Sequence, residues 1–146
     1  MTISIRLLAA GDKDAWLNLF RQYIAFYEEA VAEDVVELTW QRLVHQADGM
    51  MGFSAVNEAG ILSGIAVIIF HRSTWAATQY CYLEDLFVAP AARGAGVGRA
   101  LIDAVYAEAD RRGADRTYWV TAGSNARARR LYDSVAILTP FVQYRR

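Results

Sequence analysis

The sequence predicts a single domain over residues 1–146 of the α/β class, with a mixed (α+β) sheet and helices on both faces. Its hydrophobic periodicity changes repeatedly between the two-residue period of strands and the 3.6-residue period of helices. The resulting order, β-α-α-β-β-β-α-β-α-β, is neither a strict βαβ alternation nor all-β. A chain of 146 residues, 55% of them hydrophobic, suffices for one core and hardly for two.

The N-terminal half is predicted to form a strand, two helices and a hairpin. Residues 3–8 alternate apolar and polar side chains, which is typical of a half-buried strand. Apolar residues at helical spacing then predict a helix after Asp12, which suits an N-cap, and a second helix after Thr39. Apolar, β-branched runs at 53–57 and 61–70 are separated by a short turn and predict the hairpin.

The C-terminal half is predicted to alternate strands and helices. A strand runs over residues 80–88 and stops before Pro90, because proline has no backbone N–H to donate. Apolar residues every four positions from Val97 predict a helix that ends at Gly113. A short strand at 117–121 and a helix capped by Ser124 follow, and a last strand covers 139–144.

Charge and cysteine usage exclude several classes of function. Fifteen Lys and Arg against 16 Asp and Glu disfavour a general nucleic-acid binder. Cys81 is the only cysteine, and His45 and His71 give no metal-ligand spacing with it, so no metal is expected. The N-terminal residues do not resemble a signal peptide, and no apolar run approaches the ~18 residues that cross a bilayer. We therefore expect a cytoplasmic protein whose partners include neither a membrane nor a nucleic acid.

Residues 93–98, Arg-Gly-Ala-Gly-Val-Gly, lie where a predicted strand ends and a predicted helix begins. Glycines leave backbone N–H groups uncovered there, and the helix N-terminus adds partial positive charge, which together favour an anion. A dinucleotide-binding turn requires a third glycine where Arg99 stands, and a P-loop requires Gly-Lys-Ser/Thr. Because an ordinary tight turn explains the glycines equally well, the surrounding residues must decide.

Those surroundings resemble the Gcn5-related N-acetyltransferase (GNAT) family. Residues 83–90, Leu-Glu-Asp-Leu-Phe-Val-Ala-Pro, match the family's strand before the turn, and residues 93–98 match its Arg-Gly-x-Gly-x-Gly variant. Asn125, Ala128, Leu131 and Tyr132 match the family's Asn-x-x-Ala-x-x-Leu-Tyr helix, and the order of elements fits over nearly the whole chain. The sequence departs from the pattern after Tyr132, where many relatives have a Gly-Phe pair.

The resemblance implies that acetyl-CoA is the acetyl donor and lies between the strand at 80–88 and the next strand. Its pantetheine would pair with backbone groups of 86–88, and its pyrophosphate would rest on the amides of 94–99. Three further arginines, Arg127, Arg129 and Arg130, either neutralise phosphate or form a solvated helix face, and the second reading is favoured. The residues implied to bind the coenzyme are Leu86, Phe87, Val88, Arg93, Gly94, Ala95, Gly96, Val97, Gly98, Arg99, Asn125 and Tyr132.

Acyl transfer to an amine needs a group that removes the ammonium proton, because an aliphatic ammonium has a pKa near ~10.4. Strict alternation places Glu84 on one face of its strand with Tyr82 and Leu86, and Asp85 on the other. Tyr82-Leu83-Glu84-Asp85 resembles the diamine and polyamine acetyltransferases of the family, whose glutamate approaches the accepting amine. We therefore choose Glu84 as the base and as a substrate contact. A merely solvated or arginine-paired carboxylate is the alternative.

Tyr132 matches the family's general acid, whose hydroxyl points at the coenzyme sulfur. A phenol pKa near ~10 and a thiol pKa near ~8.5 are close enough for a proton to pass as the C–S bond breaks. Ordinary packing of Leu131 and Tyr132 is the alternative. Cys81 falls on the opposite face from Glu84 by alternation, so we expect direct transfer in a ternary complex without an acetyl-enzyme.

The acceptor is expected to be a small cationic amine such as a diamine or polyamine. The resemblance implies that the first two helices wall the acceptor site, and we choose Tyr27 and Glu28 as its contacts. Tyr23, Trp40 and Trp75 offer further aromatic faces, although core packing is the more ordinary role of such residues. The stretch between Gln22 and Gln41 has no Lys or Arg and five acids, Glu28, Glu29, Glu33, Asp34 and Glu37.

Other functions stay open at this point. A protein or peptide lysine acetyltransferase, an N-terminal acetyltransferase and an acyl-CoA sensor without turnover all fit the same fold. A Ser/His/Asp hydrolase does not, because the sequence has no G-x-S-x-G turn. Many members of the family are dimers, and the predicted strand at 139–144 offers an edge for pairing, so a homodimer is expected.

Overall fold

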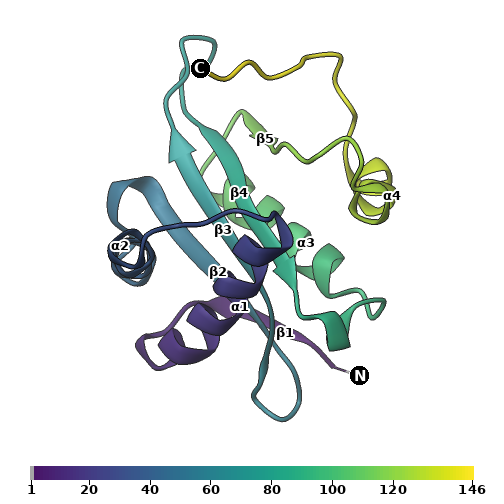
Figure 1. Ribbon diagram of the computed structural model, residues 1–146. Coiled ribbons are helices and arrows are strands. Elements are labelled where there is room, and N and C mark those ends of the chain that lie inside the picture. Colours follow the sequence, from purple (N-terminus) through teal and green to yellow (C-terminus); the bar gives the residue numbers. More distant parts are fainter. Residues whose placement is uncertain (1) are drawn as a thin grey trace.

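The computed structural model describes residues 2–146 and is built on one five-stranded sheet (Figure 1). The strand order is β1-β2-β3-β4-β5, with antiparallel pairing as far as β4 and parallel pairing between β4 and β5. A parallel pair needs a crossover, and the helix between β4 and β5 supplies it. The strands are β1 (Ser4–Leu7), β2 (Met50–Val56), β3 (Leu62–His71), β4 (Tyr80–Val88) and β5 (Arg116–Tyr118).

Along residues 2–146, four α-helices cover the two faces of the sheet. Successive residues of β3 point to opposite faces, so Ile65 and Val67 pack with α1 and α2, whereas Ala66 and Ile68 pack with α3. The predicted mixed sheet with helices on both faces is confirmed. No helix in this range combines the length with the apolar composition that a bilayer crossing demands. The helices are α1 (Lys13–Phe26), α2 (Glu33–Val44), α3 (Val97–Arg111) and α4 (Ala126–Val135), with 3₁₀ turns at Ala10–Asp12 (η1), Ala47–Gly49 (η2) and Pro90–Ala92 (η3).

The second helix begins earlier than predicted. It starts at Glu33, well before Thr39, because Val36, Trp40 and Leu43 form one buried face. Two acidic residues, Glu33 and Asp34, occupy its first turn, where a negative charge complements the helix dipole. The same acidic residues disguised the helix start, since in sequence they resemble a polar connection.

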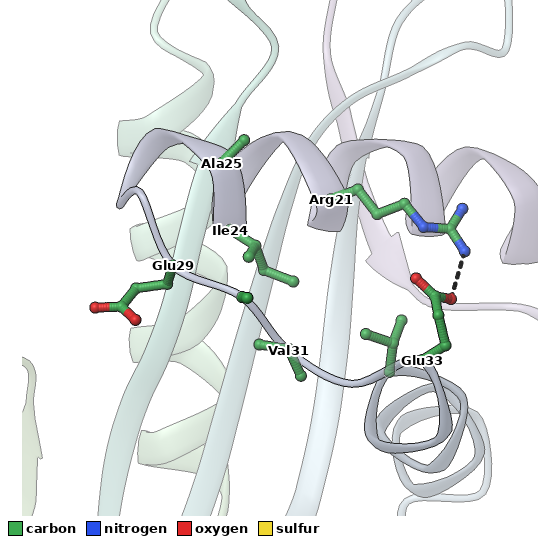
Figure 2. Close-up of a pocket in the computed structure, with 8 residues that line it drawn as sticks. Arg21, Ile24, Ala25, Glu29, Val31 and Glu33 are labelled. Atoms are coloured by element: carbon green, nitrogen blue, oxygen red, sulfur yellow. Dashed lines mark hydrogen bonds and ion pairs between the residues drawn. The ribbon is translucent and has the colours of Figure 1, made fainter.

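The connection between α1 and α2 encloses a small hollow of ≈ 230 Å³ (Figure 2). Arg21 of α1 and Glu33 of α2 form an ion pair of 3.0 Å on one side of it. Ile24 and Val31 supply apolar lining next to that pair. This contact joins the two helices at the surface.

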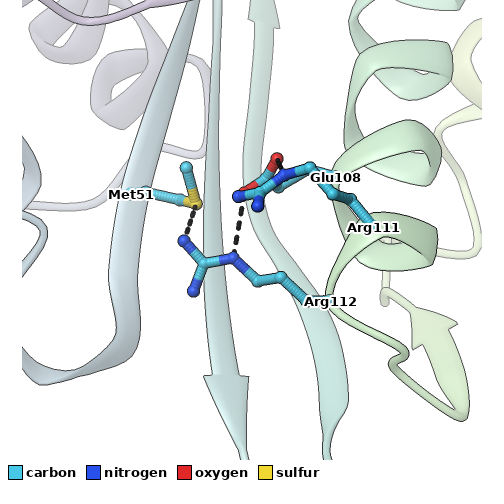
Figure 3. A network of polar contacts seen from close by, with 4 residues as sticks. All are labelled: Met51, Glu108, Arg111 and Arg112. Atoms are coloured by element: carbon cyan, nitrogen blue, oxygen red, sulfur yellow. Dashed lines mark hydrogen bonds and ion pairs between the residues drawn. The ribbon is translucent and has the colours of Figure 1, made fainter.

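The C-terminal end of α3 is fixed to the sheet by Arg112 (Figure 3). Its Nε donates to Glu108 at 2.9 Å and its guanidinium approaches the sulfur of Met51 at 3.4 Å. The guanidinium also lies 4.6 Å from the centre of the Phe70 ring, a cation–π contact. Gly113 follows with a φ of 67°, so the predicted glycine cap is confirmed.

The predicted strand at 139–144 is wrong. Residues 137–146 form an irregular tail after α4 (Figure 1), and Phe141 and Tyr144 are 87% and 94% exposed. Pro140 interrupts the segment and has no N–H to donate to a ladder. The nearest sheet edge, β5, is only three residues long and offers little backbone to pair with.

Candidate active site

The sheet opens where β5 parts from β4. Tyr80, Cys81 and Tyr82 pair with Arg116, Thr117 and Tyr118, and within residues 2–146 the β4–β5 pairing stops there. β4 continues to Val88, so its edge towards β5 carries free backbone groups over its second half. The strand predicted at 117–121 is therefore shorter than expected. This early end of pairing makes room for a ligand between two neighbouring strands.

A cavity of ≈ 420 Å³ occupies this opening and is lined from α1, β4, the glycine turn, α3 and α4. Eleven of the twelve residues predicted to bind the coenzyme line it, all but Ala95. Tyr27, a predicted acceptor contact, also lines it, whereas Glu28 and Glu84 are not among its lining residues. The other lining residues are Tyr23 and Arg127, which sequence reasoning offered only as alternative contacts, and Phe26, Ala92, Ala128 and Leu131, to which it gave no ligand.

The glycine turn provides an open backbone surface at one end of the cavity. Gly94 and Gly96 have φ values of 84° and 81°, which favour glycine, and open space surrounds the position of a Cβ on either. α3 begins at Val97, so its first N–H groups face this space and favour an anion. Gly98 has a different role, because a Cβ there would lie 3.1 Å from Leu131, and its absence lets α4 approach α3.

The arginine side chains around the turn differ in the contacts that they make. Arg93 donates from Nε to the carbonyl of Val88 at 3.1 Å and lies 5.5 Å from the Phe87 ring centre, which fixes it against β4. Arg99 donates to Ser134 at 2.7 Å and Arg129 to the carbonyl of Gly123 at 2.7 Å.

Three guanidinium groups, those of Arg93, Arg99 and Arg127, border the cavity. Arg129 and Arg130 lie outside its lining. The reading of a solvated helix face therefore fits these two better than it fits Arg127.

Tyr132 projects from α4 into the cavity. Its ring packs edge-on against Trp119 at 5.4 Å between centroids. Burial, with a smaller contribution from Tyr27, raises the pKa of Tyr132 to about 12. The phenol therefore keeps its proton at neutral pH, and it is a weaker acid relative to the coenzyme thiol than an ordinary tyrosine would be.

A β-bulge at Glu84 overturns the alternation predicted for β4. Asp85 pairs with Val67 and Leu83 with Ile68, which leaves Glu84 without a partner in the β3–β4 register. Leu83 and Leu86 consequently both face α3, although the sequence would place them on opposite faces. Tyr82 and Leu86 do not share a face, and the assumption that Glu84 aligns with both is wrong.

Asp85 lies close to Tyr23 of α1, and each group influences the pKa of the other. Burial, and then the charge of Glu84, raise the pKa of Asp85 to about 7, while the neighbouring Tyr23 hydroxyl opposes the rise. Glu84 itself is exposed. Sequence reasoning missed Asp85 because it treated the adjacent carboxylates as a choice between two faces, and it named Tyr23 only as one of several aromatic faces for a cation.

Known proteins that are similar to this chain identify its family. Residues 15–136 match the family described as the acetyltransferase (GNAT) family. The chain belongs to this family. It is an N-acetyltransferase whose acetyl donor is acetyl-CoA, as the family resemblance implied.

A curated relative, the D-amino-acid N-acetyltransferase HPA3 of Saccharomyces cerevisiae (strain ATCC 204508 / S288c), is 34% identical over 145 residues, 99% of this chain and 90% of that protein. The structure of AAC(6')-Iy with the bisubstrate analogue CoA-S-monomethyl-acetylneamine has a TM-score of 0.86, 21% identity and coverage of 100% of this chain and 98% of that one. The structure of a ribosomal-protein-alanine N-acetyltransferase from Brucella melitensis biovar Abortus 2308 has a TM-score of 0.82 and 20% identity. The match covers 98% of this chain and 97% of that one.

The acidic field predicted over the first two helices of this GNAT protein is weaker than its composition indicates. Glu33 pairs with Arg21 at 3.0 Å, and Glu37 pairs with Lys13 at 2.9 Å. Both of these basic residues belong to α1 and precede the segment between Gln22 and Gln41, which has no Lys or Arg. Glu28 and Glu29, at the end of α1, carry the charge nearest to Tyr27.

Proposed function

We propose that this GNAT enzyme transfers acetyl directly from acetyl-CoA to the primary amine of a small cationic molecule, in a ternary complex. One observation carries the proposal: a cavity between diverging strands has an anion-binding turn at one end and a protonated tyrosine in its wall. Gly94 and Gly96 support binding of the pyrophosphate, and Tyr132 supports release of the thiol.

The coenzyme would lie along the free edge of β4. Backbone groups of Leu86, Phe87 and Val88 are available there because β5 ends its pairing at Tyr118. Amides from Gly94 to Arg99, Ala95 included, would hold the pyrophosphate, since the start of α3 and two left-handed glycines present N–H groups without side chains over them. Asn125 would anchor the start of α4 beside it.

The proton of the accepting amine would leave through the carboxylates at the β4 bulge. Sequence reasoning chose Glu84, and its exposure suits attraction of a cation and exchange of protons with water. The place of Asp85 beside Tyr23, and a pKa raised to about 7, support Asp85 as the group that takes the proton. We therefore propose that the two act as a pair, with Asp85 as base and Glu84 as its charged neighbour.

Direct transfer is supported by the state of Cys81. It is fully buried on the α3 face of the sheet, and burial raises the pKa of its thiol to about 11. A thiol in that position is protonated and inaccessible at neutral pH, so it is a poor nucleophile. The transfer then forms the C–N bond, with the amine proton going to Asp85, and breaks the C–S bond. Tyr132 donates its own proton to the departing thiolate.

The acceptor would be a cation such as a diamine or polyamine, because Glu28 follows the lining residue Tyr27, and Glu84 and Asp85 precede the lining residue Leu86. A free amino acid is the second candidate, since a relative 34% identical to this chain is named a D-amino-acid N-acetyltransferase. Arg116 is an exposed cation near Tyr118 that is available for the carboxylate of such a substrate.

An assay of CoA thiol release separates these possibilities. Purified enzyme and acetyl-CoA are combined with diamines, D- and L-amino acids, an aminoglycoside and a lysine peptide in parallel. We expect turnover of small amines to exceed that of the peptide, because α1 and α4 border the cavity on both sides. Preferred turnover of the peptide would support a protein acetyltransferase. Coenzyme binding without thiol release from any amine would support a sensor instead.

We also propose that the protein is a cytoplasmic homodimer. The tail after α4 exposes five large apolar side chains, which favours burial against a second copy. These residues are Ile137, Leu138, Phe141, Val142 and Tyr144. Sedimentation of the whole chain and of a chain truncated after Ala136 tests this proposal, and a monomer in both cases would contradict it.

A further inference from the structure

A wall of aromatic and acidic side chains continues from the cavity along the α1 face of the sheet. At the cavity end, the rings of Tyr23 and Tyr27 lie 5.2 Å apart, and Tyr23 lies 6.0 Å from Phe87. Tyr23 is also close enough to Asp85, which belongs to β4, to influence its pKa. The wall therefore passes from α1 onto the sheet at the proposed site of transfer.

Beyond Asp85, the wall continues with two tyrosines from neighbouring strands. Tyr82 of β4 and Tyr118 of β5 are the last paired residues before the strands part, and their rings lie 4.8 Å apart. The bulge at Glu84 keeps Tyr82 on the same face as Asp85, although the two are three positions apart in sequence. Both rings are partly exposed.

The Tyr118 ring is held in place by His71. Nδ1 of His71 lies 2.8 Å from the carbonyl oxygen of Arg72, which only accepts, so Nδ1 carries the hydrogen. Nε2 of the neutral ring is then an acceptor, and the Tyr118 hydroxyl donates to it at 2.6 Å. This bond occupies the hydroxyl, while the residue remains partly exposed.

A negative charge stands at the rim of this tyrosine pair. Glu84 is exposed and lies close to both Tyr82 and Tyr118, so its charge influences the pKa of each. Aromatic faces next to a carboxylate attract cations. Arg116 places its guanidinium 4.5 Å from the centre of the neighbouring Tyr80 ring, so one ring of this cluster already holds a cation.

We propose that Tyr82, Tyr118 and Glu84 form a subsite for a second positive charge of the acceptor, whose reacting amine lies beside Asp85. The inference rests on the proposed acetyl transfer. Because of the bulge, Tyr82 and Asp85 pair with Ile69 and Val67, which are two strand positions or about 7 Å apart, a separation that suits an extended aliphatic diamine. The substrate class is thus a diamine or longer polyamine, in preference to a monoamine or a free amino acid.

The test compares putrescine with butylamine, which has the same carbon chain and one amine fewer. Wild-type enzyme is expected to show kcat/KM about tenfold higher for putrescine, as a cation held by tyrosine rings and a carboxylate implies. Tyr118→Leu removes the ring and should reduce this ratio to about one, while the KM for acetyl-CoA stays unchanged. Tyr118→Phe is the control that keeps the ring face and should retain the ratio.

Arg116→Gln tests the subsite from the other direction. Arg116 repels a second ammonium near Tyr118, so its neutralisation should raise the putrescine-to-butylamine ratio about twofold. Should Tyr118→Leu lose its fold by circular dichroism, the wild-type ratio, the Phe variant and the Arg116 variant still decide the proposal.

The possible results test the subsite separately from the proposed acetyl transfer. Equal turnover of putrescine and butylamine by the wild type would overturn the subsite and leave acetyl transfer intact. Higher kcat/KM for a D-amino acid than for putrescine would also overturn it. No thiol release with any amine would instead overturn the proposed function.

Discussion

The two halves of the proposed active site are built from different parts of the chain. The coenzyme half consists largely of backbone: the glycine turn, the start of α3 and the free edge of β4, all within residues 86–99. The acceptor half consists of side chains from α1, the β4 bulge and β5, brought together over more than ninety residues of chain. Backbone donors do not titrate, whereas carboxylates do. The two halves should therefore respond differently to substitution and to pH.

The largest effect is expected at Tyr132, which lies where the halves meet. Tyr132→Phe should lower kcat by about 10²–10³-fold, because the leaving thiolate loses its proton donor. Binding of acetyl-CoA, measured by calorimetry, should change little, since the ring and its contact with Trp119 remain. An unchanged kcat would remove Tyr132 from the chemistry.

Asp85→Asn is expected to have the next largest effect, a loss of about tenfold to a hundredfold in kcat/KM for the amine at neutral pH. In the wild type, Asp85 takes a proton only when ionised, so kcat/KM should fall as pH decreases through about 7. The variant should lose that inflection. The matched control, Glu84→Gln, should reduce activity less and keep the inflection; the opposite pattern would return the role of base to Glu84.

A smaller effect is expected in the coenzyme half from Gly96→Ala. The φ of 81° strains any residue with a Cβ, so the KM for acetyl-CoA should rise about fivefold to tenfold with little change in pH dependence. Gly60→Ala is the matched control, because Gly60 has a φ of 79° in the β2–β3 turn. It should cost similar stability and leave this KM unchanged; an equal rise in both variants would disprove the role of the turn.

The smallest effect concerns stability. Burial raises the pKa of Asp85 above its unfolded value, so the folded state holds its proton more tightly and stability falls as pH rises from about 4 to about 7. Asp85→Asn should remove this loss of stability. Between pH 4 and pH 8, the change in Tm should therefore be less unfavourable in the variant than in the wild type. Glu84→Gln should remove only part of this loss, since burial remains and the Glu84 charge is the smaller cause of the raised pKa. Parallel thermal melts at the two pH values measure the difference.

Prediction from sequence succeeded where the signal is local. The periodicity of residues 97–111 predicted α3 and its glycine cap, and the apolar run at 80–88 predicted the bounds of β4. It failed at the tail, where an apolar stretch at 139–144 reads as a strand but finds no long partner edge. A strand needs a partner, and pairing over long distances is not written in the strand's own residues.

The sequence by itself determined the family and predicted the coenzyme half of the proposed site, because a turn followed by a helix presents its N–H groups through local backbone geometry alone. Only the tertiary structure decided the acceptor half. The bulge at Glu84 depends on the register between β3 and β4, and it set aside the alternation that the sequence implied for Glu84 and Asp85. The raised pKa of Asp85 likewise depends on α1 packing over β4, since burial by distant residues causes the shift.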